Sequence, residues 1–257
     1  MPINAYNICV VHDVKITVKD LTLAYQDYVV MNDISLEIQK GEVFFIMGGS
    51  GCGKSTFLKH LIGVEPVANG HVFYDNVDVN EIIQNNQSAQ HFGVLYQSGA
   101  LWGDLTLREN VSLPMEYHTE LSPKDIKDRA DFKLALVGLD GFGDFYPHEI
   151  SGGMKKRAGL ARAMALDPDV LFFDEPSAGL DPLTSRNLDQ LILEIRELFQ
   201  TTIVIVSHEL DSIFSIGDRA IFLDAETKTP LQIGNPKWLL NHGYQKIQHF
   251  LSRGRKS

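Results

Sequence analysis

The sequence is poor in cysteine and has no long apolar run. Only Cys9 and Cys52 occur among the 257 residues, which excludes a disulfide framework and favours a reducing compartment. No stretch approaches the roughly 18 consecutive apolar residues of a membrane-spanning helix. The longest apolar clusters, such as residues 170–173 and 203–206, have the length of strands. We therefore expect a chain that does not cross a bilayer by itself.

Basic residues are also scarce relative to acidic ones. Lys and Arg number 23 against 33 Asp and Glu, for a formal net charge of −10. Nucleic-acid binding depends on neutralising phosphates with Lys and Arg, so we expect no nucleic-acid partner. The first residues lack the basic start and apolar stretch of a secretory signal, which favours the cytosol. The 44% hydrophobic content is ordinary for a folded domain.

Short apolar runs predict the strands of an α/β fold. The early part of the chain is typical of β-structure, and the later strands are widely spaced with helical patterns between them, which indicates a parallel core. We expect strands at residues 15–23, 34–38, 43–47, 71–74, 92–96, 170–174, 202–206 and 220–223.

Between about residues 102 and 167 the pattern is helical, which predicts a helical subdomain inserted into the core. One helix there begins with Ser122 as N-cap, Pro123 in the first turn and Asp125 closing a capping box, and it ends at Gly138. A later helix begins at Asp181, which is followed by proline.

A glycine-rich stretch after the strand at 43–47 matches the phosphate-loop pattern G-x-x-x-x-G-K-[ST]. A helix from Lys54 to about Ile62 follows, so the pattern has the strand and helix it requires. Backbone N–H groups of such a loop surround phosphate oxygens, its lysine reaches the β- and γ-phosphates, and its serine binds Mg²⁺. The expected nucleotide-binding residues are Gly48, Gly49, Ser50, Gly51, Cys52, Gly53, Lys54, Ser55 and Thr56.

Polar side chains follow three of the expected buried strands. Asp174 and Glu175 end one strand, and His208 and Gln97 follow two others. Strand ends of a parallel sheet meet at its ligand-binding edge. Asp174 is therefore the expected Mg²⁺ partner and Glu175 the residue that polarises a water. A lone histidine at a strand end is more often structural and a lone glutamine carries little signal, so their convergence on one nucleotide is what favours them.

A second glycine turn leads into a helix at Ser151, Gly152 and Gly153. A helix start of this kind suits an anion, yet the chain has only one phosphate-loop lysine and one set of acids. Either Ser151 is a plain N-cap, or this helix start serves a nucleotide held by another copy.

The ordered set of motifs resembles the ATP-binding cassette (ABC) ATPase family over about residues 15–223. The matching motifs are a Walker A loop (residues 48–56), a Q-loop (Gln97), a signature (150–154), a Walker B strand (172–175), a D-loop (177–181) and a switch histidine (His208).

This resemblance implies a P-loop NTPase fold with a RecA-like parallel core, an N-terminal antiparallel β subdomain and the helical insertion. It also implies hydrolysis of ATP with Mg²⁺, which Ser55, Gln97 and Asp174 would hold. Two copies would pair head to tail, so that Ser151, Gly152 and Gly153 contact the partner's ATP and Asp181 lies at the shared site. Tyr25 takes the place of the family's adenine-stacking aromatic, with Tyr28 as a competitor.

Two stretches narrow the resemblance to the Mla and Mce type of bacterial lipid transporters. These are the run Gln-Ser-Gly-Ala-Leu that begins at Gln97, and Met154, which stands where most cassettes have glutamine. The implied partners are a membrane permease, an Mce-domain lipid-binding protein and a small regulatory subunit, with the chain on the cytoplasmic face of the inner membrane. A transporter of a small polar solute would carry the same catalytic residues. A soluble ABC ATPase without transport usually has two cassettes or a long coiled-coil insertion in one chain, and this sequence has neither.

We expect an ABC ATPase domain at residues 15–235 and a C-terminal tail at residues 236–257. The tail mixes apolar and polar residues at helical spacing. It resembles a segment that contacts the neighbouring cassette or a regulatory partner, and packing against its own core accounts for it equally well.

Overall fold

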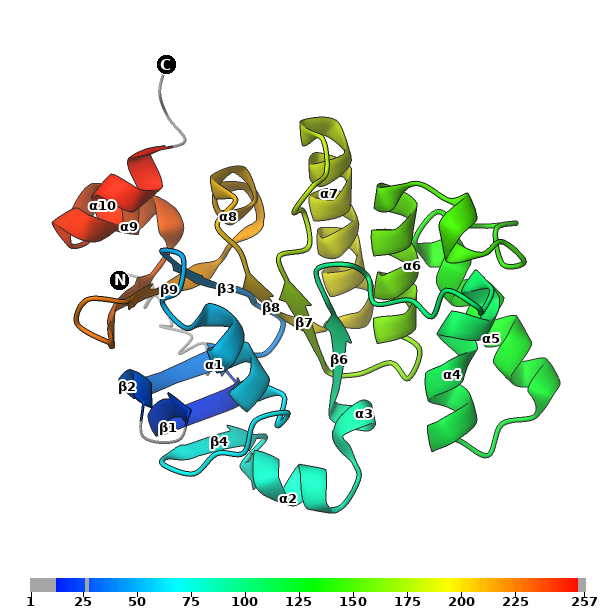
Figure 1. The fold of residues 1–257 in the computed structure, drawn as a ribbon, viewed down its shortest axis with the longest axis horizontal. Helices are drawn as coiled ribbons and strands as arrows, with labels where there is room; N and C mark the ends of the chain where they lie inside the picture. The colour runs from blue at the N-terminus through cyan, green and yellow to red at the C-terminus, as the bar shows by residue number, and fades with distance from the viewer. Residues whose placement is uncertain (1–12, 26–27, 254–257) are drawn as a thin grey trace, which may run out of the picture.

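The computed structural model describes residues 13–25 and 28–253, and it contains two sheets with helices around them (Figure 1). The first sheet is antiparallel, in the order β2-β1-β4-β5. Its strands are β1 (Val14–Tyr25), β2 (Tyr28–Gln39), β4 (His71–Tyr74) and β5 (Val77–Asp78). Along β2, Leu36 and Ile38 are buried and Glu37 is exposed. This alternation belongs to a sheet with one face on the core.

The second sheet has the order β10-β9-β3-β8-β7-β6, and its strands are parallel except for the antiparallel pair β9 and β10. Its strands are β3 (Val43–Gly48), β6 (Phe92–Leu95), β7 (Val170–Asp174), β8 (Thr202–Val206), β9 (Arg219–Asp224) and β10 (Thr229–Gly234). The parallel core and the antiparallel N-terminal sheet confirm the predicted fold class.

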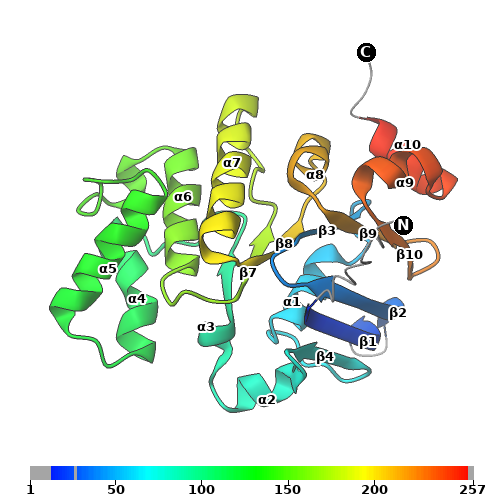
Figure 2. The ribbon, with the colours of Figure 1, turned by 180° about the vertical axis from the view of Figure 1, so that it is seen from behind.

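The two faces of β3 belong to different hydrophobic clusters. Phe44 and Ile46 pack with residues of the antiparallel sheet and of α1 (Lys54–Leu61), and Phe45 packs with the helices on the opposite face. Figures 1 and 2 show α1 between the two sheets and α7 (Pro182–Phe199) and α8 (Leu210–Ile216) on the other side of the parallel strands. Because both faces are covered, β3 is apolar throughout.

The expected helical insertion consists of α4 (Leu107–His118), α5 (Pro123–Leu136) and α6 (Gly152–Ala163), with a short 3-10 helix (Pro147–Glu149) before α6. It lies at the end of the molecule opposite the C-terminal helices (Figure 2). The Ser122 hydroxyl accepts from the Asp125 N–H, as a cap should, but the Asp125 carboxylate accepts from that hydroxyl instead of from the Ser122 backbone. The predicted capping box is therefore only half formed.

The C-terminal region forms α9 (Pro236–His242) and α10 (Gln245–Ser252), which pack on the chain itself. Leu239, Ile247 and Leu251 are fully buried in the core. Lys246 forms an ion pair with Asp224, 2.5 Å away, at the end of β9. The tail therefore packs on its own core, and its expected contact with a neighbouring cassette or a regulatory partner stays a prediction. Within residues 13–25 and 28–253, no helix combines the length and apolar content needed to span a membrane.

Short elements without a clear periodic pattern were not predicted. These are β5, β10, α2 (Val79–Gln84) and α3 (Ser88–His91). Each of the two helices has six residues or fewer, and β10 has no fully buried residue. Such segments give no hydrophobic period of their own.

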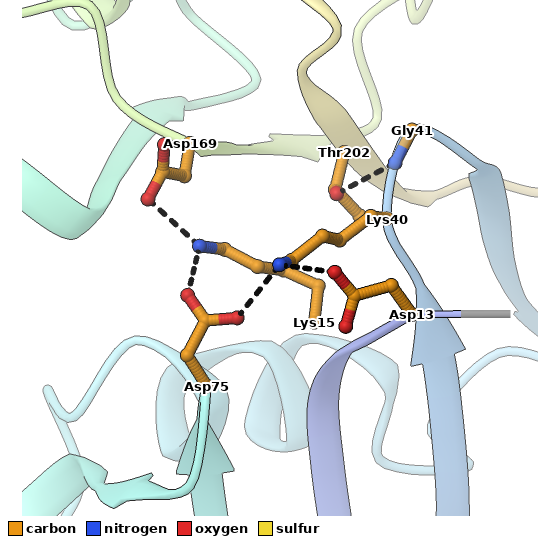
Figure 3. Close-up of polar contacts among 7 residues, drawn as sticks. All are labelled: Asp13, Lys15, Lys40, Gly41, Asp75, Asp169 and Thr202. Atoms are coloured by element: carbon orange, nitrogen blue, oxygen red, sulfur yellow. Dashed lines mark hydrogen bonds and ion pairs between the residues drawn. The ribbon is translucent and has the colours of Figure 1, made fainter. Parts of the chain in front are cut away.

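A network of charges joins the two sheets at the edge where the parallel strands begin (Figure 3). The Lys15 side chain, only 4% exposed, donates to Asp75 at 2.5 Å and to Asp169 at 2.7 Å. Asp75 belongs to the turn after β4, and Asp169 directly precedes β7. Lys40 extends the network by pairing with Asp13 at 2.6 Å. A buried ammonium is tolerated here because it has two carboxylate partners.

Candidate nucleotide-binding site

The glycine loop after β3 has a backbone that side chains would disrupt. Gly51 and Gly53 have φ of 74° and 98°, in the region that favours glycine. A Cβ on Gly53 would approach Val30 Cγ1 to 2.8 Å, and one on Gly48 would approach the carbonyl oxygen of Leu223 to 2.5 Å. The loop therefore needs glycine at these positions both for its turn and for its close packing.

Lys54 lies at the first position of α1, directly after the loop. Its Nζ donates to the carbonyl oxygens of Gly48 and Gly49, both at 3.1 Å. The ammonium is thus held across the loop by the loop's own carbonyls. A cation and free helix N–H groups at one place are the elements of a phosphate site.

A cavity of about 500 Å³ opens in front of this loop. Its lining comes from β2, the loop, the start of α1, the end of β7 and the turn between β9 and β10. The lining residues are Tyr28, Val30, Gly51, Gly53, Lys54, Ser55, Thr56, Glu175, Ala225 and Lys228. Of the other predicted loop residues, Gly48 and Cys52 are buried beneath the loop, and Gly49 and Ser50 are exposed on it.

The aromatic residue on the cavity wall is Tyr28, whose side chain is 64% exposed. Lys228 covers it: its Nζ lies 4.3 Å from the ring centroid and donates to the carbonyl oxygen of Val29 at 2.9 Å. Tyr25 pairs with Tyr28 through the backbone, but its side chain lies outside the described part of the structure, so its role stays a prediction. The sequence did not point to Lys228, which comes from a turn without a motif.

Asp174 ends β7 beside the loop, as predicted. Its Oδ1 is buried and has no hydrogen-bond partner within residues 13–25 and 28–253. Burial raises the pKa of this carboxyl, and the neighbouring Glu175 raises it further, whereas a hydrogen bond from Ser55 acts in the opposite direction. An unpaired carboxylate oxygen beside a serine hydroxyl fits Mg²⁺, which prefers hard oxygen ligands. Asp174 and Ser55 are thus the residues that would hold this ion.

The structure brings Glu175 and His208 together. His208 Nδ1 lies 2.9 Å from Glu175 Oε1, and the ring is 59% exposed. The other carboxylate oxygen, Oε2, is buried and has no partner in the part of the chain that the structure describes. Glu175 has a left-handed backbone with φ of 50°, and its N–H donates to the carbonyl oxygen of Val206 at 2.8 Å. One carboxylate oxygen is therefore oriented by histidine, and the hydrogen-bonding capacity of the other is unused.

Gln97 does not reach the cavity in this structure. It lies two residues beyond the end of β6 and is exposed. It is absent from the residues that line the cavity among those the structure describes. Its expected contact with Mg²⁺ therefore stays a prediction.

The signature residues line a different cavity. Ser151 is the N-cap of α6 and accepts from the N–H of Met154 at 3.2 Å. Ser151 and Gly153 line a cavity of about 490 Å³ that shares no residue with the one at the phosphate loop. Asp181 caps α7 by accepting from the N–H groups of Leu183 and Thr184. One copy of the chain thus does not bring its own signature to its own phosphate loop.

Cys52 is fully buried under the loop. Burial raises the pKa of its thiol, which keeps it protonated and unreactive at neutral pH. A Cβ on Gly48 would lie 2.6 Å from the Cys52 sulfur. The side chain therefore fills space beneath the loop.

The comparisons with known proteins agree with this geometry. The family model described as ABC transporter matches residues 31–178. The probable ribonucleotide transport ATP-binding protein mkl of Mycobacterium leprae is 42% identical over 207 residues, which are 80% of this chain and 60% of that protein. The chain thus spans less than two thirds of the length of this relative.

Two further comparisons cover most of both chains. The intermembrane phospholipid transport system ATP-binding protein MlaF of Haemophilus influenzae is 37% identical over 92% of this chain and 89% of its own length. A dimeric ATP-binding cassette solved in a post-hydrolysis state with ADP and Pi superposes with a TM-score of 0.77 at 28% identity, over 86% of this chain and 98% of that one. By its family match, by these relatives and by its fold, the chain belongs to the ABC transporter family as an ATP-binding cassette.

Proposed function

We propose that this chain is the ATP-hydrolysing subunit of a transporter that moves phospholipids or other lipids between bacterial membranes. The observation that carries the hydrolytic part is the unpaired Glu175 oxygen beside the Lys54 loop, with His208 holding the other oxygen at 2.9 Å. A nucleotide-binding module without turnover would not need this arrangement.

Phosphoryl transfer asks a protein mainly for positioning and charge stabilisation. Lys54 and the loop N–H groups bind the phosphates, and Ser55 and Asp174 hold Mg²⁺, which supplies further charge stabilisation when bound. The free oxygen of Glu175 accepts a hydrogen bond from the attacking water and orients it toward the γ-phosphate. His208 keeps the Glu175 carboxylate in this orientation and stabilises the charge that develops.

The active form in this proposal is a head-to-tail dimer with two composite sites. It is supported by the separate cavities of the signature and the phosphate loop in one copy, and by the similar cassette that was solved as a dimer. In such a pair Ser151, Gly152 and Gly153 contact the ATP of the partner, and Asp181 lies near the same site. A two-fold axis makes both sites equivalent.

The lipid substrate is supported by the similarity to MlaF over nearly the whole chain and by the Gln97 run and Met154. Exposing two acyl chains to water would cost on the order of 20 kcal/mol, at about 0.8 kcal/mol per CH₂. A lipid therefore needs a covered path, which a membrane permease and an Mce-type lipid-binding protein would provide. In this arrangement the cassette binds the permease at the cytoplasmic face of the inner membrane, with a small regulatory subunit as a further partner.

The similarity to mkl, whose name refers to ribonucleotide transport, favours a polar solute as the second candidate. The test is to purify the chain with its native membrane partners and reconstitute them into liposomes that contain labelled phospholipid or labelled nucleotide. We expect ATP-dependent release or exchange of phospholipid to an acceptor. ATP-dependent movement of nucleotide alone would overturn the lipid proposal and leave the ATPase intact.

The dimer has its own test. Replacing Ser151 and Gly153 together by glutamate places negative charge at the partner's phosphates, so we expect ATP turnover of the complex to fall while each copy still folds. Undiminished turnover would exclude a shared site. Asn187→Glu, at an exposed residue of α7 that lines the same cavity, is the control for added charge alone.

A further inference from the structure

Lys156 connects the signature helix to the catalytic acid of its own chain. It lies five residues after Ser151 on α6 and is only 6% exposed. Its Nζ donates to the backbone carbonyl oxygen of Glu175 at 3.3 Å. No motif considered in the sequence includes it. A lysine that is buried with its ammonium directed at a catalytic segment is an unusual feature that packing alone does not require.

The segment that Lys156 contacts is conformationally constrained. Glu175 has φ of 50°, which is unfavourable for a residue with a side chain and persists only where the surroundings hold it. Its N–H is fixed by Val206, and its carbonyl oxygen accepts from the N–H of Ala178 at 3.2 Å as well as from Lys156. Lys156 is thus the contact to this backbone that comes from the helical insertion.

The charge of Lys156 also faces the two acids of the site. Burial lowers the pKa of its ammonium, and Glu175 and Asp174 act in the opposite direction. The positive charge therefore stabilises the ionised carboxylates that the site requires. The neighbouring Lys155 is partly exposed and projects from the same turn of the same helix, and it provides a matched control.

The other end of α6 is fixed to the loop that contains Gln97. A Cβ on Gly159 would approach the carbonyl oxygen of Gly99 to 2.8 Å, so helix and loop are in close contact. Arg162 donates to the carbonyl oxygens of Gly99 and Ala100. Because α6 is a continuous helix, Ser151 and Lys156 are separated by about 7.5 Å along its axis, at 1.5 Å per residue, and they move together.

We propose that Lys156 is a positioning residue that links the two sites of the dimer: when α6 closes on the partner's ATP through Ser151, Lys156 sets the backbone of Glu175 in its own site. This inference rests on the proposed function, because it needs the dimer and its turnover. It goes further by assigning a residue through which one site senses the occupancy of the other. In this proposal α6 has an engaged and a released position, and ATP at either site shifts the balance between them.

The test uses the whole complex with its membrane partners and compares Lys156→Met with Lys155→Met. For Lys156→Met we expect kcat to fall by about tenfold with KM for ATP changed by less than about twofold, because the phosphate contacts are intact. The Hill coefficient of turnover against ATP concentration should fall toward one. Lys155→Met should match the wild type, and Lys156→Arg should recover most of the lost turnover because it keeps the charge and the donor.

A binding measurement separates positioning from general damage. In a Glu175→Gln background, Lys156→Met should still form the ATP-bound dimer, observed by size-exclusion chromatography. If Lys156→Met fails to fold, Lys156→Gln replaces it and must show the same loss of kcat. Wild-type kcat and Hill coefficient in the folded variant would overturn the inference. Absence of ATP turnover in the wild-type complex would instead overturn the proposed function.

Discussion

Charged side chains at the two ends of the parallel strands differ in whether they have partners. An aspartate lies at each end of β7, with Asp169 directly before the strand and Asp174 as its last residue. Asp169 precedes the strand and pairs with buried Lys15 at 2.7 Å, in a network where Lys40 also pairs with Asp13 (Figure 3). Asp174 ends the strand. Its Oδ1 and Oε2 of Glu175 are buried, and neither has a hydrogen-bond partner among the residues described. The aspartate at the start of β7 thus has an ion-pair partner, whereas one carboxylate oxygen at the end of β7 lacks a hydrogen bond.

The difference separates stability from function. Buried polar groups are almost always hydrogen-bonded, since leaving one unpaired costs about 1–3 kcal/mol. The paired edge holds the antiparallel sheet on the parallel one, through contacts that span β1, the β4–β5 turn and the start of β7. The unpaired edge lies at the cavity of the phosphate loop. Oxygens left free there can take a metal ion and a water as their partners.

The largest expected effect is the loss of ATP turnover when the carboxylate of Glu175 is replaced by an amide. Glu175→Gln keeps the shape of the side chain and removes its charge, so we expect ATP turnover to fall by roughly 10²–10⁴-fold, the usual contribution of a general base. ATP-bound dimers should accumulate, as observed by light scattering with ATP and Mg²⁺. Glu116→Gln, on the exposed face of α4, is the control for loss of one charge. Turnover within a few-fold of the wild type would remove Glu175 from this role.

The next effect comes from breaking the paired edge. Lys15→Met leaves Asp75 and Asp169 without their shared donor, and we expect a loss of about 2 kcal/mol in the free energy of unfolding. Both aspartates are partly exposed, so water can hydrate them and limit the loss. Urea unfolding measures the change.

Lys40→Met is the matched control for this prediction, because the side chains of Lys40 and Asp13 are 46% and 69% exposed and exposed pairs contribute little. Its loss should be clearly the smaller one. ATP turnover per folded Lys15→Met molecule should stay close to the wild type, because the network lies at the far edge from the nucleotide. Equal losses for the two lysines would mean that burial does not decide the strength of this network.

The comparison also explains what the sequence could predict. The strands β3, β7 and β8 were predictable from their short apolar runs, and the loop at Gly48 from the spacing of its glycines and lysine. The acids at the end of β7 followed from the parallel sheet. The partners of Lys15 were not predictable, since they lie 60 and 154 residues away. Lys156 and Lys228 were missed for the same reason: their contacts depend on how helices and turns meet in space.

A smaller effect distinguishes the two ends of β7 directly. Because Asp174 is half-buried and its Oδ1 has no hydrogen-bond partner among the described residues, Asp174→Asn should raise the free energy of unfolding of the nucleotide-free protein by about 1 kcal/mol, although ATP turnover is lost. Asp169→Asn should lower stability, since it removes a partner of Lys15. Thermal and urea unfolding of the two variants measure these opposite signs. Destabilisation by Asp174→Asn would show that Oδ1 has a partner in solution.

The difference in stability between Asp174→Asn and the wild type depends on pH, because the pKa of Asp174 is raised in the folded state. Below 3.8, the ordinary value, the carboxyl is protonated in both states and carries no penalty. As the pH rises from 3.8 through the higher pKa of the folded state, the unfolded chain loses its proton first, so the native state loses stability. The advantage of Asp174→Asn over the wild type should therefore be absent in acid, grow across this window and stay constant above it.

The smallest expected effect is on ATP affinity and concerns Tyr28, whose ring already contacts Lys228. Lys228 lies over the Tyr28 ring at 4.3 Å, so one face of the ring has a partner before any nucleotide binds. An aromatic contact is worth about 1 kcal/mol, and competition with Lys228 reduces the gain. We expect Tyr28→Ala to weaken ATP binding by about twofold to fivefold, the equivalent of at most about 1 kcal/mol, and Tyr28→Phe to change it less. Titration of the Glu175→Gln protein with a fluorescent ATP analogue measures this. A larger loss in Tyr25→Ala than in Tyr28→Ala would assign the adenine contact to Tyr25.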